Sequence, residues 1–205
     1  MDVDSTLIQD EVIELLAEFA GARDEVARVT EAAMRGELDF EESLRARVKT
    51  LAGLPAEVLN TTFESVRISE GAVELIAAVH ASGGRVGAVS GGFNQILEPI
   101  AKQLNLDYYR ANQLEVVDGA LTGRVVGEII DRKAKADTLL EWAKDFGISP
   151  DLVAAIGDGA NDLDMFEVAG ISFAYNAKPK VRQAADVCID EPDLSLVISH
   201  LALKR

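Results

Sequence analysis

Short apolar runs alternate with segments of helical periodicity from residue 69 to the end of the chain. The apolar runs, which we interpret as buried strands, are residues 85–89, 114–117, 121–126, 152–156, 171–175 and 187–189. Helices are predicted around and between them, over residues 71–81, 93–104, 133–146, 161–169, 181–185 and 194–203. Strands that alternate with helices build a mostly parallel sheet with helices on both faces. We therefore predict a Rossmann-like α/β fold, with a hairpin turn at Asp118-Gly119.

The segment before this alternation has a different pattern. Residues 11–63 show charged, helical periodicity, and no strand pattern interrupts them. Apolar residues recur there at helical spacing, as in Val12, Leu16 and Phe19. We therefore predict that residues 11–65 form a small helical bundle, inserted into an α/β core of residues 1–10 and 66–205.

Composition narrows the possible classes of function. The chain has 205 residues and a formal charge of −15, which argues against nucleic acid or an anionic membrane as a partner. It has no stretch of about 18 uncharged apolar residues, so we expect no membrane span. The single cysteine, Cys188, cannot form an internal disulfide, which favours a reduced, cytoplasmic protein. Within its apolar run, Cys188 is predicted to be buried and inert.

Polar motifs stand where the apolar runs end. Ser90-Gly91-Gly92 follows one predicted strand, Gly157-Asp158-Gly159 follows another, and Asp2-Val3-Asp4 stands at the beginning of the sequence. Lys135 lies at the start of a predicted helix. Open α/β sheets bind ligands at the carboxyl ends of their strands. We therefore predict that these separate motifs form one site.

The residues of this predicted site suit phosphoryl chemistry. In an extended chain Asp2 and Asp4 point the same way and can face one ligand. An ionised aspartate attacks phosphorus without a base, so Asp2 is the predicted nucleophile and Asp4 the acid and base. Ser90, Gly91 and Lys135 are predicted to bind the phosphate.

Charge indicates that a cation belongs in such a site. The predicted site has up to four carboxylates but only one lysine. A phosphate monoester would add about two more negative charges. Unit charges about 4 Å apart repel by about 4 kcal/mol at an effective dielectric constant near 20. Mg²⁺ favours carboxylates together with substrate oxygen and water, and Asp2, Asp4 and Asp158 are its predicted ligands.

Two other interpretations of these motifs fail. A calcium-binding loop that starts at Asp2 needs glycine at its sixth position and glutamate at its twelfth, where the chain has Leu7 and Ile13. Residues 157–162 resemble a dinucleotide-binding fingerprint, but the third glycine is missing and Asp158 would repel a pyrophosphate. Metal binding is therefore the preferred interpretation of the acidic motifs.

Over the whole chain, the motif set resembles that of the haloacid dehalogenase superfamily of aspartate-nucleophile phosphatases. The matching positions are Asp2-Val3-Asp4-Ser5-Thr6, Ser90, Lys135 and Gly157-Asp158-Gly159-Ala160-Asn161-Asp162. The resemblance favours Lys135 over its neighbour Lys133 as the catalytic lysine. It also implies that the helical bundle of residues 11–65 is a cap domain that sets substrate specificity.

Within that superfamily, the sequence is most similar to the phosphoserine phosphatases. The resemblance implies that Glu11 meets the ammonium group of the substrate and that Arg47 meets its carboxylate, both from the cap. It implies that Asn161 and Asp162 contribute to the outer shell of the metal and hold the lysine in place. The alternative for Glu11 and Arg47 is a solvated surface charge on a cap helix.

The resemblance implies a magnesium-dependent phosphomonoester hydrolase that works through an aspartyl-phosphate. Its expected substrate is the phosphorylated amino acid O-phospho-L-serine, hydrolysed to L-serine and phosphate in serine biosynthesis. One alternative is a phosphatase or phosphotransferase for another small phosphorylated metabolite. A second alternative is a truncated, inactive relative that only binds a ligand.

The sequence departs from the superfamily at its beginning. The resemblance implies an apolar central strand that runs into Asp2, where the sequence has only Met1. We expect this strand to be missing from the chain. Without it, partner strands would be unpaired and the nucleophile poorly anchored, so we expect low activity or poor folding.

Overall fold

The computed structural model describes residues 1–35 and 37–203. The strands of these residues are β1 (Gly87–Phe93), β2 (Tyr108–Val117), β3 (Ala120–Val126), β4 (Ala154–Gly157), β5 (Ile171–Tyr175) and β6 (Val187–Ile189). They form two sheets, in the orders β1-β2-β3 and β4-β5-β6. All neighbours run parallel except β2 and β3, which form the hairpin predicted at Asp118-Gly119. The predicted α/β fold, rich in parallel strands, is confirmed.

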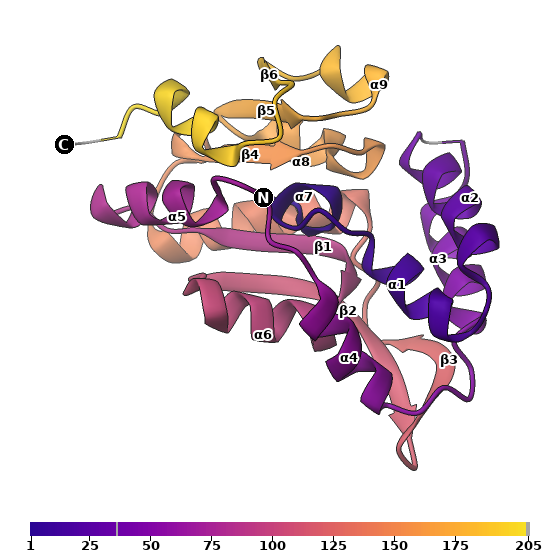
Figure 1. The fold of residues 1–205 in the computed structure, drawn as a ribbon. Coiled ribbons are helices and arrows are strands. Elements are labelled where there is room, and N and C mark those ends of the chain that lie inside the picture. The colour runs from indigo at the N-terminus through magenta and orange to yellow at the C-terminus, as the bar shows by residue number, and fades with distance from the viewer. Residues whose placement is uncertain (36, 204–205) are drawn as a thin grey trace.

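Met1 and Asp2 join the two sheets. The Met1 amino group donates to the Gly87 carbonyl at 2.7 Å, and Val89 N donates to the Met1 carbonyl at 2.9 Å. On the other side, Asp2 N donates to the Ile156 carbonyl at 2.9 Å. In the part of the chain that the structure describes, no strand lies between β1 and β4, so these residues do not form the central strand that the resemblance implies. Figure 1 shows the N-terminus in this position, between the two sheets.

The helices cover the sheets and extend beyond them. They are α1 (Val12–Phe19), α2 (Arg23–Met34), α3 (Phe40–Lys49), α4 (Glu57–Ser65), α5 (Ala72–Ala81), α6 (Asn94–Leu104), α7 (Arg132–Phe146), α8 (Leu163–Val168) and α9 (Pro179–Arg182). Helix α6 packs on β1 and β2, whereas α7 packs on β1 and α8. Helices α1, α2 and α3 gather beyond the end of β1 towards which its arrow points (Figure 1).

Two helices that matter for the site begin at aspartates. The side chain of Asp39 accepts a hydrogen bond from Glu42 N at 2.8 Å and starts α3. The side chain of Asp131 accepts one from Ala134 N at 2.8 Å and starts α7. These caps fix where the two helices begin and therefore where their first residues point.

The segment that contains α1 to α4 leaves and rejoins the α/β core at one place. Gln9 N donates to the Arg67 carbonyl at 2.9 Å, and Ser69 N donates to the Leu7 carbonyl at 3.0 Å. Arg67 also forms an ion pair of 2.6 Å with Asp10. The two chain crossings therefore lie side by side, close to the domain boundaries that the sequence predicts.

A cavity of about 430 Å³ opens beside Met1, between the two sheets. Its walls include side chains of β1, β4, α5 and α7, among them Trp142 and Phe146. The joint between the sheets is therefore packed at Met1 and Asp2 and open beyond them.

Local structure departs from prediction at several places, such as strand β2, which begins at Tyr108 instead of Leu114. Strand β1 continues through Ser90-Gly91-Gly92 to Phe93, because a shift in register lets these residues bulge opposite β2. The last segment, predicted as a helix over residues 194–203, is a 3-10 helix over Leu194–His200. No helix among the described residues is long and apolar enough to cross a membrane.

The prediction that Cys188 is buried was wrong. Strand β6 lies at the edge of its sheet, and along it Ile189 faces the core while Cys188 is exposed. An apolar run of three residues cannot reveal that its middle residue faces outward on an edge strand.

Candidate active site

Asp2 lies at the joint between the two sheets and is 1% exposed. Its Oδ1 accepts hydrogen bonds from Val3 N at 2.7 Å and from Lys135 Nζ at 2.6 Å. Its Oδ2 has no hydrogen-bond partner among the described residues. The predicted nucleophile therefore keeps one buried oxygen free to meet phosphorus or a cation.

The loop after β4 is held by Asp162. Oδ2 of Asp162 accepts hydrogen bonds from Asp158 N at 3.2 Å and from Gly159 N at 3.1 Å. Its Oδ1 accepts one from Lys135 Nζ at 2.8 Å. A Cβ atom at Gly157 would lie 2.3 Å from Oδ2 of Asp162, so a side chain at that position would collide with the carboxylate. This close approach explains why the motif has glycine there.

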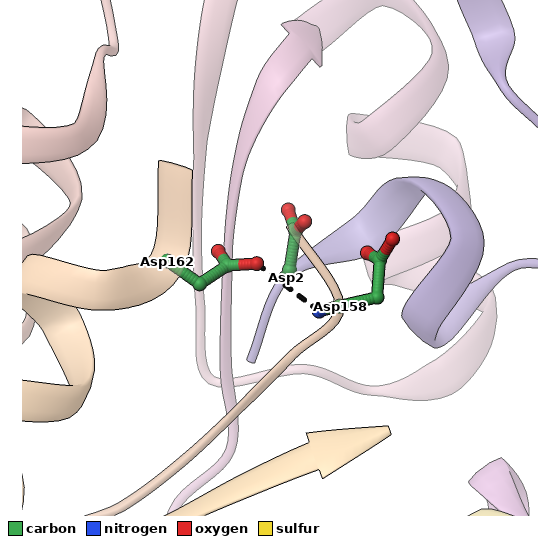
Figure 2. Close-up of side chains that lie close together, drawn as sticks. All are labelled: Asp2, Asp158 and Asp162. Carbon is green, nitrogen blue, oxygen red and sulfur yellow. Dashed lines mark hydrogen bonds between the residues drawn. The ribbon is translucent and has the colours of Figure 1, made fainter. Parts of the chain in front are cut away.

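Three carboxylates converge at this point. Asp2, Asp158 and Asp162 each offer an oxygen within 4.8 Å of the others, as Figure 2 shows. Burial raises the pKa of Asp158 to about 7. Burial and the charge of Asp162 raise the pKa of Asp2 well above its usual range. Ionisation of this cluster is therefore unfavourable unless positive charge is nearby.

Lys135 supplies one such charge. It is completely buried, and its burial opposes the ammonium form. The charges of Asp162 and Asp2 outweigh that effect and raise the pKa of Lys135 above its usual value. Because one ammonium group cannot balance three carboxylates, the cluster still lacks positive charge.

The residues present fit a metal ion. Two buried oxygens, Asp2 Oδ2 and Asn161 Oδ1, find no hydrogen-bond partner among the described residues. Asp158 offers a carboxylate whose Oδ1 accepts only the Thr6 hydroxyl, at 3.2 Å, among these residues. The two oxygens of Asp162, by contrast, already accept three hydrogen bonds. Asp2 and Asp158 are thus the carboxylates best placed to hold a cation, with Asn161 beside them.

Asp4 lies outside this cluster of three carboxylates. Its Oδ1 accepts a hydrogen bond from Val12 N at 2.7 Å, and its Oδ2 accepts one from the Ser90 hydroxyl at 2.9 Å. Burial raises the pKa of Asp4 above its usual value. Its raised pKa suits an acid, and its role as a metal ligand stays a prediction.

Ser90, Gly91 and Gly92 form part of the wall of a pocket next to Asp4. Ser90 Oγ accepts a hydrogen bond from Gly92 N at 2.7 Å while it donates to Asp4. A Cβ atom at Gly92 would lie 2.7 Å from Asp4 Oδ2, which again excludes a side chain. Ser90, Gly91 and Gly92 line a small pocket together with Asp2 and Asp4.

Glu11 and Arg47 line the same pocket. Glu11 is the residue before α1, and Arg47 lies in α3. Glu11 is half-buried, and desolvation together with the charge of Asp4 raises its pKa well above the usual range. Its Oε1 accepts the Ser5 hydroxyl at 2.5 Å, but it forms no ion pair within the described residues. Its position therefore differs from that of a solvated surface charge.

Arg47 is buried, with 7% of its surface exposed. Its guanidinium donates to the Ser43 carbonyl at 3.1 Å and to the Thr30 hydroxyl at 2.9 Å. No carboxylate pairs with it in the part of the chain that the structure describes, and burial lowers its pKa. A buried guanidinium that lacks a counter-ion is a ready site for an anion.

The pocket is narrowed by Phe40 and by Met34, which the sequence did not single out as a binding residue. A Cβ atom at Gly91 would lie 2.7 Å from Phe40 Cζ, and one at Gly159 would lie 2.7 Å from Met34 Sδ. Phe40 and Met34 therefore press on the two glycine loops. About 30 Å³ remains free inside, roughly the space of two water molecules.

Other contributors to the site also escaped prediction. Ser5, Thr6 and Thr30 each hold a site residue through a hydroxyl group. Ser5 and Thr6 follow the acidic pair directly, which was the available signal for them. Thr30 lies within a helix pattern that carries no such signal.

A comparison with sequence families matches residues 1–167 to the model of the haloacid dehalogenase-like hydrolases. Among curated proteins, the chain is 52% identical over 204 residues to phosphoserine phosphatase SerB2 of Mycobacterium tuberculosis. That match covers 100% of this chain and 50% of the relative. The chain thus spans about half the length of this relative.

Other matches extend over nearly the whole of both proteins. The chain is 50% identical over 201 residues to the phosphoserine phosphatase of Streptococcus thermophilus, covering 98% of this chain and 94% of that one. A solved structure described as a phospho-aspartyl intermediate analogue of phosphoserine phosphatase superposes with a TM-score of 0.95 at 42% identity. It covers 98% of this chain and 96% of that one.

Proposed function

We propose that this chain, which belongs to the haloacid dehalogenase-like hydrolase family, hydrolyses O-phospho-L-serine to L-serine and phosphate. Membership rests on the family match over residues 1–167. The substrate rests on one structural observation: a single pocket holds a half-buried Glu11 and a buried Arg47, neither with an ionic partner among the described residues. An amino acid brings the ammonium group and the carboxylate that these two residues lack.

In this proposal, Asp2 is the nucleophile. Its free Oδ2 bonds to phosphorus and the ester P–O bond breaks, so that an aspartyl-phosphate forms. Asp4, whose raised pKa favours the protonated form, would give a proton to the departing serine oxygen. It then takes a proton from the water that attacks phosphorus, and Asp2 leaves as a carboxylate.

Ser90 in the pocket wall and Lys135, which is buried against Asp2, would hold the phosphoryl oxygens. Ser90 offers its hydroxyl, and Lys135 carries a charge that its carboxylate partners stabilise. Mg²⁺, which we propose is held by Asp2 and Asp158 beside Asn161, would offset the negative charge that accumulates on the phosphoryl group.

We also propose that residues 11–65 act as a cap that sets specificity. Phe40 and Met34 come from this segment and meet the glycine loops of the core, and Arg47 of the same segment lines the pocket. Its two adjacent crossings, at residues 8–10 and 66–69, would act as the hinge. Because only about 30 Å³ is free in the pocket, the cap must open to admit phosphoserine.

The test of the chemistry is phosphate release from O-phospho-L-serine with and without Mg²⁺, for the wild type and Asp2→Asn. We expect Asp2→Asn to lower kcat by at least about a thousandfold, because the amide cannot form the acyl phosphate. A wild-type rate in the variant would reject the mechanism. A wild-type protein that folds and takes up phosphate but hydrolyses no phosphomonoester would support the ligand-binding alternative.

The test of the substrate compares phosphoserine with phosphoethanolamine, which lacks the carboxylate. Arg47→Met should raise KM for phosphoserine about 10- to 100-fold and change KM for phosphoethanolamine little, because a charged hydrogen bond contributes about 1.5–3 kcal/mol. An equal effect on both compounds would favour another small phosphorylated metabolite.

A further inference from the structure

Asn112 joins two segments of the site that are far apart in sequence. It lies in β2, is 1% exposed, and uses both polar atoms of its side chain. Its Nδ2 donates to the Gly91 carbonyl at 2.9 Å, and its Oδ1 accepts from Ile130 N at 2.8 Å. The residue thus connects the serine loop with the segment that leads into α7.

The bulge in β1 explains why a side chain is needed there. Val89 pairs with Arg110 and Phe93 pairs with Asn112, so residues 90–92 stand opposite a single residue of β2. The sheet ladder is therefore interrupted at Gly91. The Asn112 amide supplies a hydrogen bond to the carbonyl of the bulged residue, which holds the bulge in one conformation.

The peptide group between Gly91 and Gly92 is held at both ends. Asn112 donates to its carbonyl oxygen, and its N–H donates to Ser90 Oγ at 2.7 Å. Ser90 Oγ in turn donates to Asp4 Oδ2 at 2.9 Å. A rotation of this peptide would therefore remove the donor that orients the Ser90 hydroxyl.

The other end of the connection leads to the lysine. Ile130 precedes Asp131, the residue that starts α7, and Lys135 lies in the first turns of that helix. Lys135 Nζ then reaches Asp2 at 2.6 Å. Asn112 thereby fixes the start of α7 against the bulge that carries Ser90.

We propose that Asn112 is a positioning residue that sets the distance and orientation between Ser90 and Lys135, the two groups that receive the phosphoryl oxygens. The inference rests on the proposed function, because it assigns these groups their role. Asn112 itself touches neither Asp2 nor Asp4 through any hydrogen bond of the described residues. It acts through the Gly91–Gly92 peptide and through α7.

A neighbouring amide provides a matched control. Gln95 Nε2 donates to the Leu114 carbonyl at 2.8 Å, and Leu114 N donates to Gln95 Oε1 at 3.3 Å. Gln95 therefore also clamps main-chain atoms, but it joins α6 to β2 and contacts no site residue through these bonds. Asn112→Asp and Gln95→Glu each replace an amide nitrogen that donates to a carbonyl by a carboxylate oxygen, at nearly constant volume.

The experiment measures kinetics and product binding for the wild type, Asn112→Asp and Gln95→Glu. We expect Asn112→Asp to lower kcat for phosphoserine about 10- to 100-fold and to weaken binding of inorganic phosphate, measured by calorimetry with Mg²⁺. Binding of L-serine, which meets Glu11 and Arg47, should stay within about twofold. Gln95→Glu should leave kcat and phosphate binding unchanged at a comparable melting temperature.

The pH dependence of kcat provides a further test, because a purely structural role of Asn112 would not change it. The introduced carboxyl can donate to the Gly91 carbonyl only when it is protonated, and burial raises its pKa. The kcat ratio of wild type to Asn112→Asp should therefore shrink as pH falls. Wild-type kcat and phosphate affinity in Asn112→Asp, or equal losses in both variants, would overturn the inference. Absence of turnover in the wild type would reject the proposed function instead, and phosphate calorimetry would still decide the role of Asn112.

Discussion

The carboxyl groups of Asp2, Asp158 and Asp162 and the ammonium group of Lys135 are buried together, and their charges do not balance. The imbalance makes the site unstable on its own and receptive to a cation. Sequence alone indicated Asp2, Asp158 and Lys135, because strand ends and a helix start meet at one edge of such a sheet.

The roles within this group were harder to predict. Asp162 turns back onto the amides of Asp158 and Gly159, and Asp4 turns away towards Ser90 and Val12. Both depend on the conformation of a short loop, which no hydrophobic pattern encodes. The same holds for Asn112, whose position in β2 gives no sign that it contacts a bulge in β1.

Removal of a metal from the site should reveal the buried charge of Asp158. Its folded pKa of about 7 lies above the usual 3.8, so the folded state holds this proton more tightly and the free energy of unfolding falls as pH rises through that interval. Without metal at pH 8, Asp158→Asn should therefore be more stable than the wild type by roughly 4 kcal/mol. At pH 4.5 the difference should shrink to about 1 kcal/mol.

Chemical denaturation of both proteins at the two pH values measures this difference. Excess Mg²⁺ at pH 8 should stabilise the wild type and leave Asp158→Asn unchanged. A stability difference that is independent of pH would contradict the assignment of the raised pKa to Asp158.

Lys135 and Lys133 allow a sharp comparison within one helix. Lys135→Met leaves Asp2 and Asp162 without their ammonium partner and should lower the free energy of unfolding by about 3–5 kcal/mol, together with kcat. Lys133 is exposed and pairs with Asp137 on the surface, so Lys133→Met should change stability by no more than about 0.5 kcal/mol. Thermal melts and phosphate release check both. Similar losses in the two variants would show that the wrong lysine has been chosen.

At the scale of elements, hydrophobic period and turn chemistry predicted most helices and strands. Strand β5 (Ile171–Tyr175) and strand β6 (Val187–Ile189) coincide with the predicted ranges. Strand β1 was predicted too short, because its last residues are polar and glycine-rich and its bulge depends on pairing with β2. Strand β2 begins at Tyr108, before its predicted start at Leu114, although its end at Val117 was predicted. Pairing between neighbours therefore extends strands beyond the residues that an apolar pattern marks.

Helix α3 starts at the N-cap residue Asp39, and its first residue, Phe40, lines the pocket. Asp39→Ala removes the hydrogen bond to Glu42 N and should lower the free energy of unfolding by about 1 kcal/mol. Because Phe40 is the first residue of α3 and lines the pocket, KM for phosphoserine should rise as well. Asp39→Ser keeps a capping oxygen and should restore both values. Melting curves and steady-state kinetics would contradict this if all three proteins behaved alike.

At the scale of the molecule, the two sheets are separate units that meet at Met1 and Asp2. The sequence predicted the α/β architecture but left the expected central strand without residues to form it. The order of the strands in the sheets decides which strands flank that space. It also decides that part of the space is an open cavity of about 430 Å³. Hydrophobic patterns carry no information on that order.

The proposed catalytic groups are divided between the two sheets. Ser90 comes from one, Asp158 and Asp162 come from the other, and Asp2 stands between them, held with Met1 by three backbone hydrogen bonds. A slight parting of the sheets would scatter these groups while each sheet stays folded, as in sub-global opening. Rising urea should therefore abolish turnover before far-UV circular dichroism changes, and bound Mg²⁺ with phosphate should bring the two midpoints together. Coincident midpoints without ligands would mean that the sheets separate only when the whole protein unfolds.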